Sequence, residues 1–131
     1  MQPVDIRRRI ELALEFFNRA MRAEDPFFYY WTALEVLCNG KAGKIKQRLS
    51  LVYDLSIPEV DDRLGMARVA QWRHDLFHRG QRVWHSADVE RYVQLLFLDL
   101  LRRELHLPSR RRASAMLQGD DYDLSALGIA P

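Results

Sequence analysis

The stretch with the highest density of titratable side chains runs from Gln71 to Gly80 and reads Gln-Trp-Arg-His-Asp-Leu-Phe-His-Arg-Gly. Within it, Arg73 stands five positions before His78, and His74 directly follows Arg73. A guanidinium group can hold phosphate oxygens in a planar fork of donors, and an imidazole exchanges protons near neutral pH. Arg73 and His78 are therefore candidates for chemistry on a phosphodiester.

The spacing alone is not specific in a chain with so many arginines. All but three of its 20 basic residues are arginine, and an arginine five positions before one of the four histidines arises by chance in roughly 40% of such chains. Arg68 and Arg79 also precede a histidine at a similar distance, but a polar residue follows only Arg73. The alternative interpretation is that the two histidines of this stretch end a helix and that Arg73 forms an ion pair.

The composition fits a single domain without a membrane segment. The 131 residues are 48% hydrophobic and carry a formal net charge of +2, which is enough to bury one core and permits a nucleic-acid partner without requiring one. The single cysteine, Cys38, excludes an internal disulfide and fits a reducing compartment. The N-terminus lacks the pattern of a signal peptide, and the longest apolar run, Val93–Leu101, is too short to cross a bilayer. We therefore expect a cytoplasmic protein with no membrane contact.

Apolar residues recur every three or four positions, and no alternating strand pattern is present, so the sequence predicts an all-α bundle of five to six helices. The expected helices are Val4–Ala23, Pro26–Asn39, Lys44–Tyr53, Ser56–Leu64, Met66–Phe77 and Ser86–Leu105. They form one helical domain over residues 1–107. Residues 108–131 are expected to be a tail, with room for one short helix, that packs on the body or on a partner.

The segment Pro26–Asn39 is apolar on nearly every side and should form the central helix. Its aromatic residues could stack on nucleotide bases, but helical spacing favours packing in the core or in a dimer. Glu35 is the one acidic residue in this helix, and a carboxylate in apolar surroundings is costly unless it is paired. Arg73 is the expected partner of Glu35, and a partly exposed Glu35 without that contact is the alternative.

Arg73 and His78 would not share one face of a regular helix, because five residues turn about 140° beyond one full turn. Two arrangements would bring them together. His78 could lie at a fraying or tightened helix end, which Gly80 favours. It could instead act together with a second copy of the motif.

Two further basic clusters are candidates for contact with a phosphate backbone. Arg7, Arg8 and Arg9 lie in the first helix, where a solvated helix face is the favoured interpretation. All three lysines lie between residues 41 and 46, and this cluster, which includes Lys44, could provide a landing surface for RNA or simply keep a loop soluble. No spacing of histidines and carboxylates typical of a zinc site is present, so we expect no metal.

The motif Arg73-His74-x-x-x-His78, followed by Arg79-Gly80, resembles the R-polar-x-x-x-H motif of the HEPN superfamily of small helical domains. The stretch Trp31-Thr-Ala-Leu-Glu-Val-Leu resembles the second helix of the Apea-like HEPN subgroup. The resemblance covers most of residues 4–107. It implies an HEPN-like helical bundle.

The resemblance implies a metal-independent endoribonuclease without a cofactor, which cleaves single-stranded RNA by attack of the 2′-hydroxyl and leaves a cyclic phosphate. In that scheme His78 is the general base or acid and Arg73 positions or neutralises the scissile phosphate. His74 stands where the family most often has Asn, and it would assist by hydrogen bonding. Glu35 would hold Arg73 in place through an ion pair. The residues expected to guide the RNA strand are Arg79, Arg82 and Lys44.

The resemblance also implies a homodimer with a composite active site, in a toxin–antitoxin, antiphage defence or stress-response setting. An antitoxin or a nucleotidyltransferase would then be a partner. The alternative is a non-catalytic HEPN module for dimerisation or RNA sensing, partnered with a nucleotidyltransferase or another effector. A helical bundle without a nucleic-acid role is the third interpretation. Exposure distinguishes a catalytic from a structural role of Arg73 and His78, because catalytic side chains must line an open groove and structural ones should be buried against Glu35. A flat charge distribution around the motif would indicate the third interpretation.

Overall fold

The structure is a computed structural model that describes residues 3–79 and 86–128, with the side chains of residues 5–77 and 86–128. This part of the chain forms helices and turns without a strand. The α-helices are α1 (Pro3–Ala20), α2 (Pro26–Cys38), α3 (Ala42–Tyr53), α4 (Ile57–Arg63), α5 (Met66–Arg79), α6 (Ala87–Glu104) and α7 (Arg112–Ala115). Two 3₁₀ helices follow, η1 (Gly119–Asp121) and η2 (Leu124–Leu127). The predicted all-α bundle is confirmed in these residues, and the predicted tail contributes α7.

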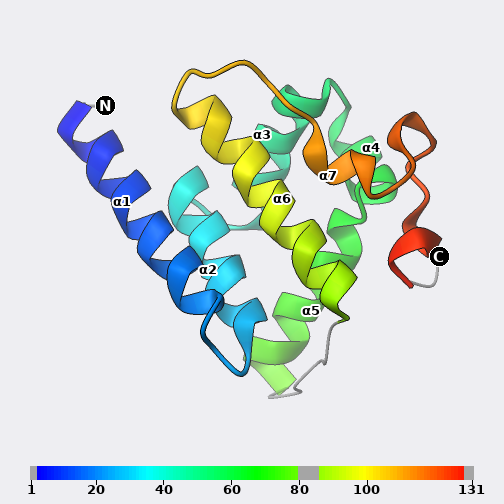
Figure 1. The fold of residues 1–131 in the computed structure, drawn as a ribbon, viewed down its shortest axis with the longest axis horizontal. Helices are drawn as coiled ribbons and strands as arrows, with labels where there is room; N and C mark the ends of the chain where they lie inside the picture. The colour runs from blue at the N-terminus through cyan, green and yellow to red at the C-terminus, as the bar shows by residue number, and fades with distance from the viewer. Residues whose placement is uncertain (1–2, 80–85, 129–131) are drawn as a thin grey trace.

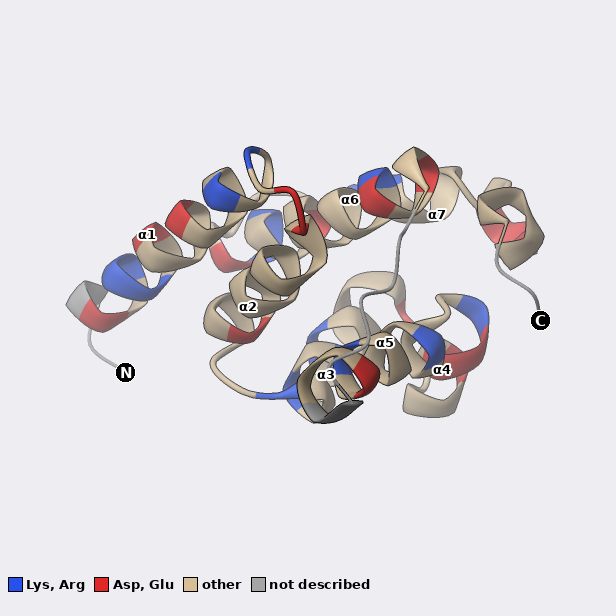
Figure 2. Ribbon diagram, turned by 90° about the horizontal axis from the view of Figure 1, so that it is seen from below, with Lys and Arg blue, Asp and Glu red and all other residues tan. Residues whose placement is uncertain are grey.

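The helices are arranged in two layers, with α2 at the centre. Figure 2 shows α1, α6 and α7 on one side of the molecule and α3, α4 and α5 on the other. Helix α2 lies between α1 and α6 (Figure 1) and also packs against α3 and α5. Its side chains Trp31, Leu34 and Leu37 are completely buried. The prediction that this apolar helix is central is therefore confirmed.

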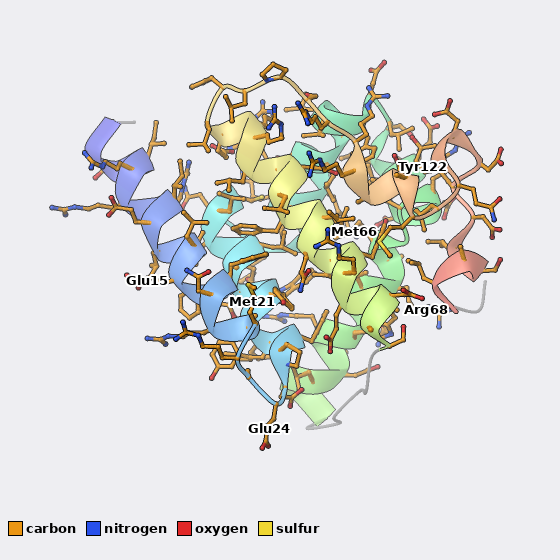
Figure 3. The ribbon with its side chains drawn as sticks, viewed as in Figure 1. Glu15, Met21, Glu24, Met66, Arg68 and Tyr122 are labelled. Carbon is orange, nitrogen blue, oxygen red and sulfur yellow. The ribbon has the colours of Figure 1, made fainter. Side chains whose placement is uncertain are left out.

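Two helix ends differ from the sequence prediction. Helix α1 ends at Ala20, three residues early, because the chain must turn back before Pro26 begins α2. This turn leaves Met21, labelled in Figure 3, 63% exposed. Helix α5 continues to Arg79, two residues beyond the predicted end at Phe77. The motif around Arg73 therefore lies entirely on one helix.

Two sequence signals fix where α4 and α5 begin. The Ser56 hydroxyl accepts a hydrogen bond from the Glu59 N–H, and the Glu59 carboxylate accepts one from the Ser56 N–H, which is a complete capping box. Gly65 has a φ of +69°, and a Cβ atom there would lie 3.0 Å from Leu124 of the tail. Both conditions favour glycine at this position, and α5 begins directly after it.

The tail lies on the body of the same chain, where Leu117 is completely buried. Helix α7 begins against the buried carboxylate of Asp99 in α6, which accepts hydrogen bonds from the backbone N–H groups of Arg112 and Ala113 at 3.1 Å each. The Tyr53 hydroxyl donates a hydrogen bond to the same carboxylate at 2.5 Å. Burial raises the pKa of the Asp99 carboxyl, although these hydrogen bonds oppose the shift. One buried carboxylate thus joins α3, α6 and α7.

Asp99→Ala is expected to lower the free energy of unfolding by about 3 kcal/mol, because it leaves a buried hydroxyl and two backbone N–H groups without their acceptor. Amide hydrogen exchange should become faster first in residues 112–127. Urea unfolding measures the loss. Asp62→Ala, which removes an exposed carboxylate of α4, is the matched control and should change the stability by less than about 0.5 kcal/mol. Equal effects of the two substitutions would contradict the anchoring role of Asp99.

Candidate nucleic-acid interface

Arg73 lies in the middle of α5 and is half-buried. Its guanidinium carbon lies 4.5 Å from the centre of the Phe77 ring, one helical turn further on. Residues four apart face the same side of a helix, so this contact is local to α5. The contact holds the cation against the face of an aromatic ring that is 43% exposed.

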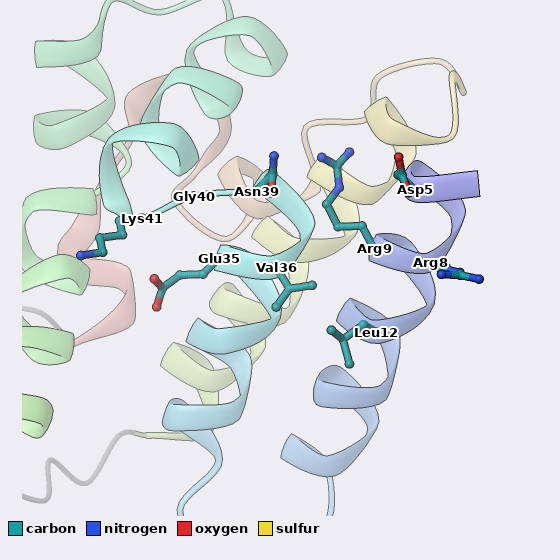
Figure 4. A pocket seen from close by; sticks show the side chains of 9 residues that line it. All are labelled: Asp5, Arg8, Arg9, Leu12, Glu35, Val36, Asn39, Gly40 and Lys41. Carbon is teal, nitrogen blue, oxygen red and sulfur yellow. The ribbon is translucent and has the colours of Figure 1, made fainter. Parts of the chain in front are cut away.

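Glu35 and Arg73 are not joined by an ion pair, within the part of the chain that the structure describes. Glu35 is half-buried and lines a groove of about 670 Å³ beside α1 and the C-terminal end of α2, together with Arg8 and Lys41 (Figure 4). The guanidinium of Arg73 instead lies along α5 against Phe77. The ion pair expected between Glu35 and Arg73 is therefore absent from the described residues, and Glu35 is partly exposed, as in the alternative interpretation.

The two histidine positions of the motif share one side of α5. His74 is exposed, and position 78 lies in the last turn of the helix, which stays α-helical through Arg79. Positions 74 and 78 are about 40° apart around the helix axis, whereas positions 73 and 78 are about 140° apart. A tightened turn therefore does not bring positions 73 and 78 onto one face. The side chain of His78 lies outside the described residues.

Two aromatic rings are exposed next to Arg73. Phe28, near the start of α2, is 37% exposed, and the centre of its ring lies 5.3 Å from that of Phe77. Tyr29 approaches Phe28 with ring centres 5.2 Å apart. Of the aromatic residues expected to pack in the core or in a dimer, Trp31 packs in the core, whereas Phe28 is exposed because α2 reaches the surface at its first turn. The four-residue spacing of Arg73 and Phe77 is the signal in the sequence for this group.

The residues predicted to guide an RNA strand are only partly described. Lys44 is exposed in the first turn of α3 and forms no ion pair with a described residue. The neighbouring Lys46 pairs with Asp61, with 2.8 Å between nitrogen and oxygen. The side chain of Arg79 and all of Arg82 lie outside the described residues. Among the residues predicted to guide an RNA strand, Lys44 is therefore the one whose exposure the structure establishes.

The arginines at the start of α1 have different surroundings. Arg7 is exposed and pairs with Glu11 at 3.2 Å. The Arg9 side chain is only 12% exposed, and its Nη2 atom lies 3.3 Å from Oε2 of Glu104 in α6. The expectation of a solvated helix face is wrong for Arg9, because the last turn of α6 covers it. Arg9 therefore has a structural partner and is not available for a phosphate backbone.

The described residues offer neither a cysteine nucleophile nor a cluster of metal ligands. Cys38 is buried, and burial raises its pKa to about 12, so it remains a neutral thiol at neutral pH. Within the described ranges, no three His, Cys, Asp or Glu side chains are placed to hold a metal ion together. None of the described helices has the length and apolar character needed to span a bilayer.

Helix α5 brings Arg73, His74 and Phe77 together at the surface, and Phe28 of α2 joins them. Glu35 and Lys44 come from other helices. Comparison with protein-family models, with curated proteins and with solved structures finds no match for this chain.

Proposed function

We propose that this protein is a metal-independent endoribonuclease of the HEPN type that cleaves single-stranded RNA at α5. The observation that carries the proposal is the presence of Arg73 and His74 at the surface of one helix, with Arg73 held by an aromatic ring and not by Glu35. A guanidinium that no described carboxylate neutralises is available for a phosphate group. The motif ending at His78 supports the same reaction through its resemblance to HEPN domains.

In the proposed reaction, the 2′-hydroxyl of the substrate attacks the adjacent phosphorus. The imidazole of His78 accepts the hydroxyl proton while the bond from O2′ to phosphorus forms. The bond from phosphorus to O5′ breaks, and the leaving oxygen takes up a proton from water, which gives a 2′,3′-cyclic phosphate and a 5′-hydroxyl. Arg73 stabilises the negative charge that develops on the phosphoryl oxygens, and His74 adds a hydrogen bond.

A second copy of the chain completes the proposed site. Because positions 73 and 78 are about 140° apart on α5, one helix presents its arginine and its second histidine to different sides. A symmetric dimer can place Arg73 of one protomer opposite His78 of its partner, and symmetry then forms the same pair twice. An antitoxin or a nucleotidyltransferase that controls such a nuclease is part of the same proposal.

The test is the incubation of the purified protein with end-labelled single-stranded RNA in EDTA. We expect cleavage products that end in a 2′,3′-cyclic phosphate, and no cleavage of a matched oligonucleotide that lacks the 2′-hydroxyl at the cut position. A requirement for an added divalent metal, or equal cleavage of the 2′-deoxy substrate, would contradict the mechanism. Binding of RNA without cleavage would support the second candidate function, a non-catalytic RNA-sensing module, which the exposed Phe28 and Phe77 also favour.

A further inference from the structure

We infer that Phe28 and Phe77, together with Arg73, form a surface on which unpaired bases of an RNA strand stack. The inference rests on the proposed function, because it names how the same site holds its substrate. It concerns binding and not the reaction itself. Binding and cleavage can therefore be tested separately.

The three side chains form a continuous row across two helices. The guanidinium of Arg73 lies 4.5 Å from the Phe77 ring centre, and the Phe77 ring lies 5.3 Å from the Phe28 ring, with their planes 31° apart. Both rings are more than a third exposed. The row therefore offers two partly exposed aromatic rings and one delocalised cation side by side.

A second aromatic contact beneath this row holds α2 and α5 together. Phe27 is 5% exposed, and its ring packs edge to face against Trp72 with centres 6.1 Å apart. These two residues directly precede Phe28 and Arg73 in the sequence. This contact between Phe27 and Trp72 joins the two helices independently of the exposed rings of Phe28 and Phe77.

Exposed aromatic rings beside a cation suit single-stranded nucleic acid. Every base has a flat face that stacks on an aromatic ring, and arginine adds an attraction to both the base and the phosphate. In a duplex the faces of the bases are covered by their neighbours, so they are not available to the protein. The row therefore predicts a substrate with unpaired bases and little preference for sequence.

Phe28→Leu and Phe77→Leu test the inference, because leucine keeps an apolar side chain and removes the flat ring. The probe is a fluorescein-labelled single-stranded oligonucleotide with 2′-O-methyl riboses, which cannot be cleaved by attack of a 2′-hydroxyl. We expect each substitution to weaken binding about tenfold in fluorescence anisotropy. The corresponding duplex should bind wild type and variants equally weakly.

Phe16→Leu is the matched control. Phe16 lies on α1, and Arg19 is placed over its ring at 5.7 Å, so this pair also combines a phenylalanine and an arginine. No described aromatic ring contacts Phe16 in the way that Phe28 contacts Phe77. We expect Phe16→Leu to leave RNA binding unchanged. Thermal unfolding of all three variants checks that they are folded.

Three outcomes separate this inference from the nuclease proposal. Unchanged affinity in both Phe28→Leu and Phe77→Leu overturns the stacking surface, whether or not the wild type cuts RNA. Weakened binding in a protein that never cleaves supports the stacking surface and removes the nuclease. A variant whose mass in light scattering falls from dimer to monomer shows that a second copy covers the rings, which also overturns the inference.

Discussion

His78→Ala should lower the rate of RNA cleavage by a factor of about 10²–10⁴, which is the usual contribution of a general acid–base group. The loss should appear in kcat with little change in KM, because Arg73 binds the phosphate and the rings of Phe28 and Phe77 bind the bases. Initial rates on a single-stranded oligoribonucleotide, measured over a range of substrate concentrations, separate the two constants.

His106→Ala is the control for this substitution. His106 is an exposed histidine just after the end of α6, outside the motif. Its removal should leave kcat and KM unchanged, and both variants should keep the circular dichroism spectrum and the mass of the wild type. Cleavage at the wild-type rate by His78→Ala would contradict the assignment of the base.

The fold is predictable from the sequence where its signals are local. Ser56 and Glu59 form a capping box within one turn, and Gly65 separates α4 from α5 through its own backbone conformation. The apolar residues around Trp31 identify the helix on which the others pack. The predicted end of α5 was two residues too early, because the apolar pattern ends at Phe77 and the helix continues to Arg79.

The candidate site is predictable only in part. The sequence placed Arg73 and His74 on one helix, which is confirmed. The sequence did not identify the contact of Arg73 with Phe77. The cost of burying a carboxylate indicated instead an ion pair between Glu35 and Arg73. Glu35 lies in an open groove where water can solvate its charge, and Arg8 and Lys41 line the same groove. Phe77 lies one helical turn from Arg73 on the same helix, so their contact orders few additional groups.

Contacts between distant polar residues could not be predicted at all. In the sequence, Asp99 is an interruption of an apolar run, yet it is buried and holds the start of α7. Arg9 similarly contacts Glu104, 95 residues later. Apolar periodicity shows which face of a helix a residue occupies, but it does not show which element meets that face.

A composite site predicts a second large effect. Two chains that are inactive separately should recover activity when they form a heterodimer. In a heterodimer of an Arg73→Ala chain and a His78→Ala chain, one of the two sites has lost both groups. The other site combines the intact Arg73 of one protomer with the intact His78 of its partner. A site formed within a single chain would remain defective in both protomers.

Co-expression of the two variants with different affinity tags, followed by purification over both tags, yields the heterodimer alone. Its cleavage rate on single-stranded RNA in EDTA should be about half that of the wild type, because one site of two is intact. Each homodimeric variant should be inactive in the same assay. A heterodimer as inactive as its parents, or a chain that forms no dimer, would contradict the composite site.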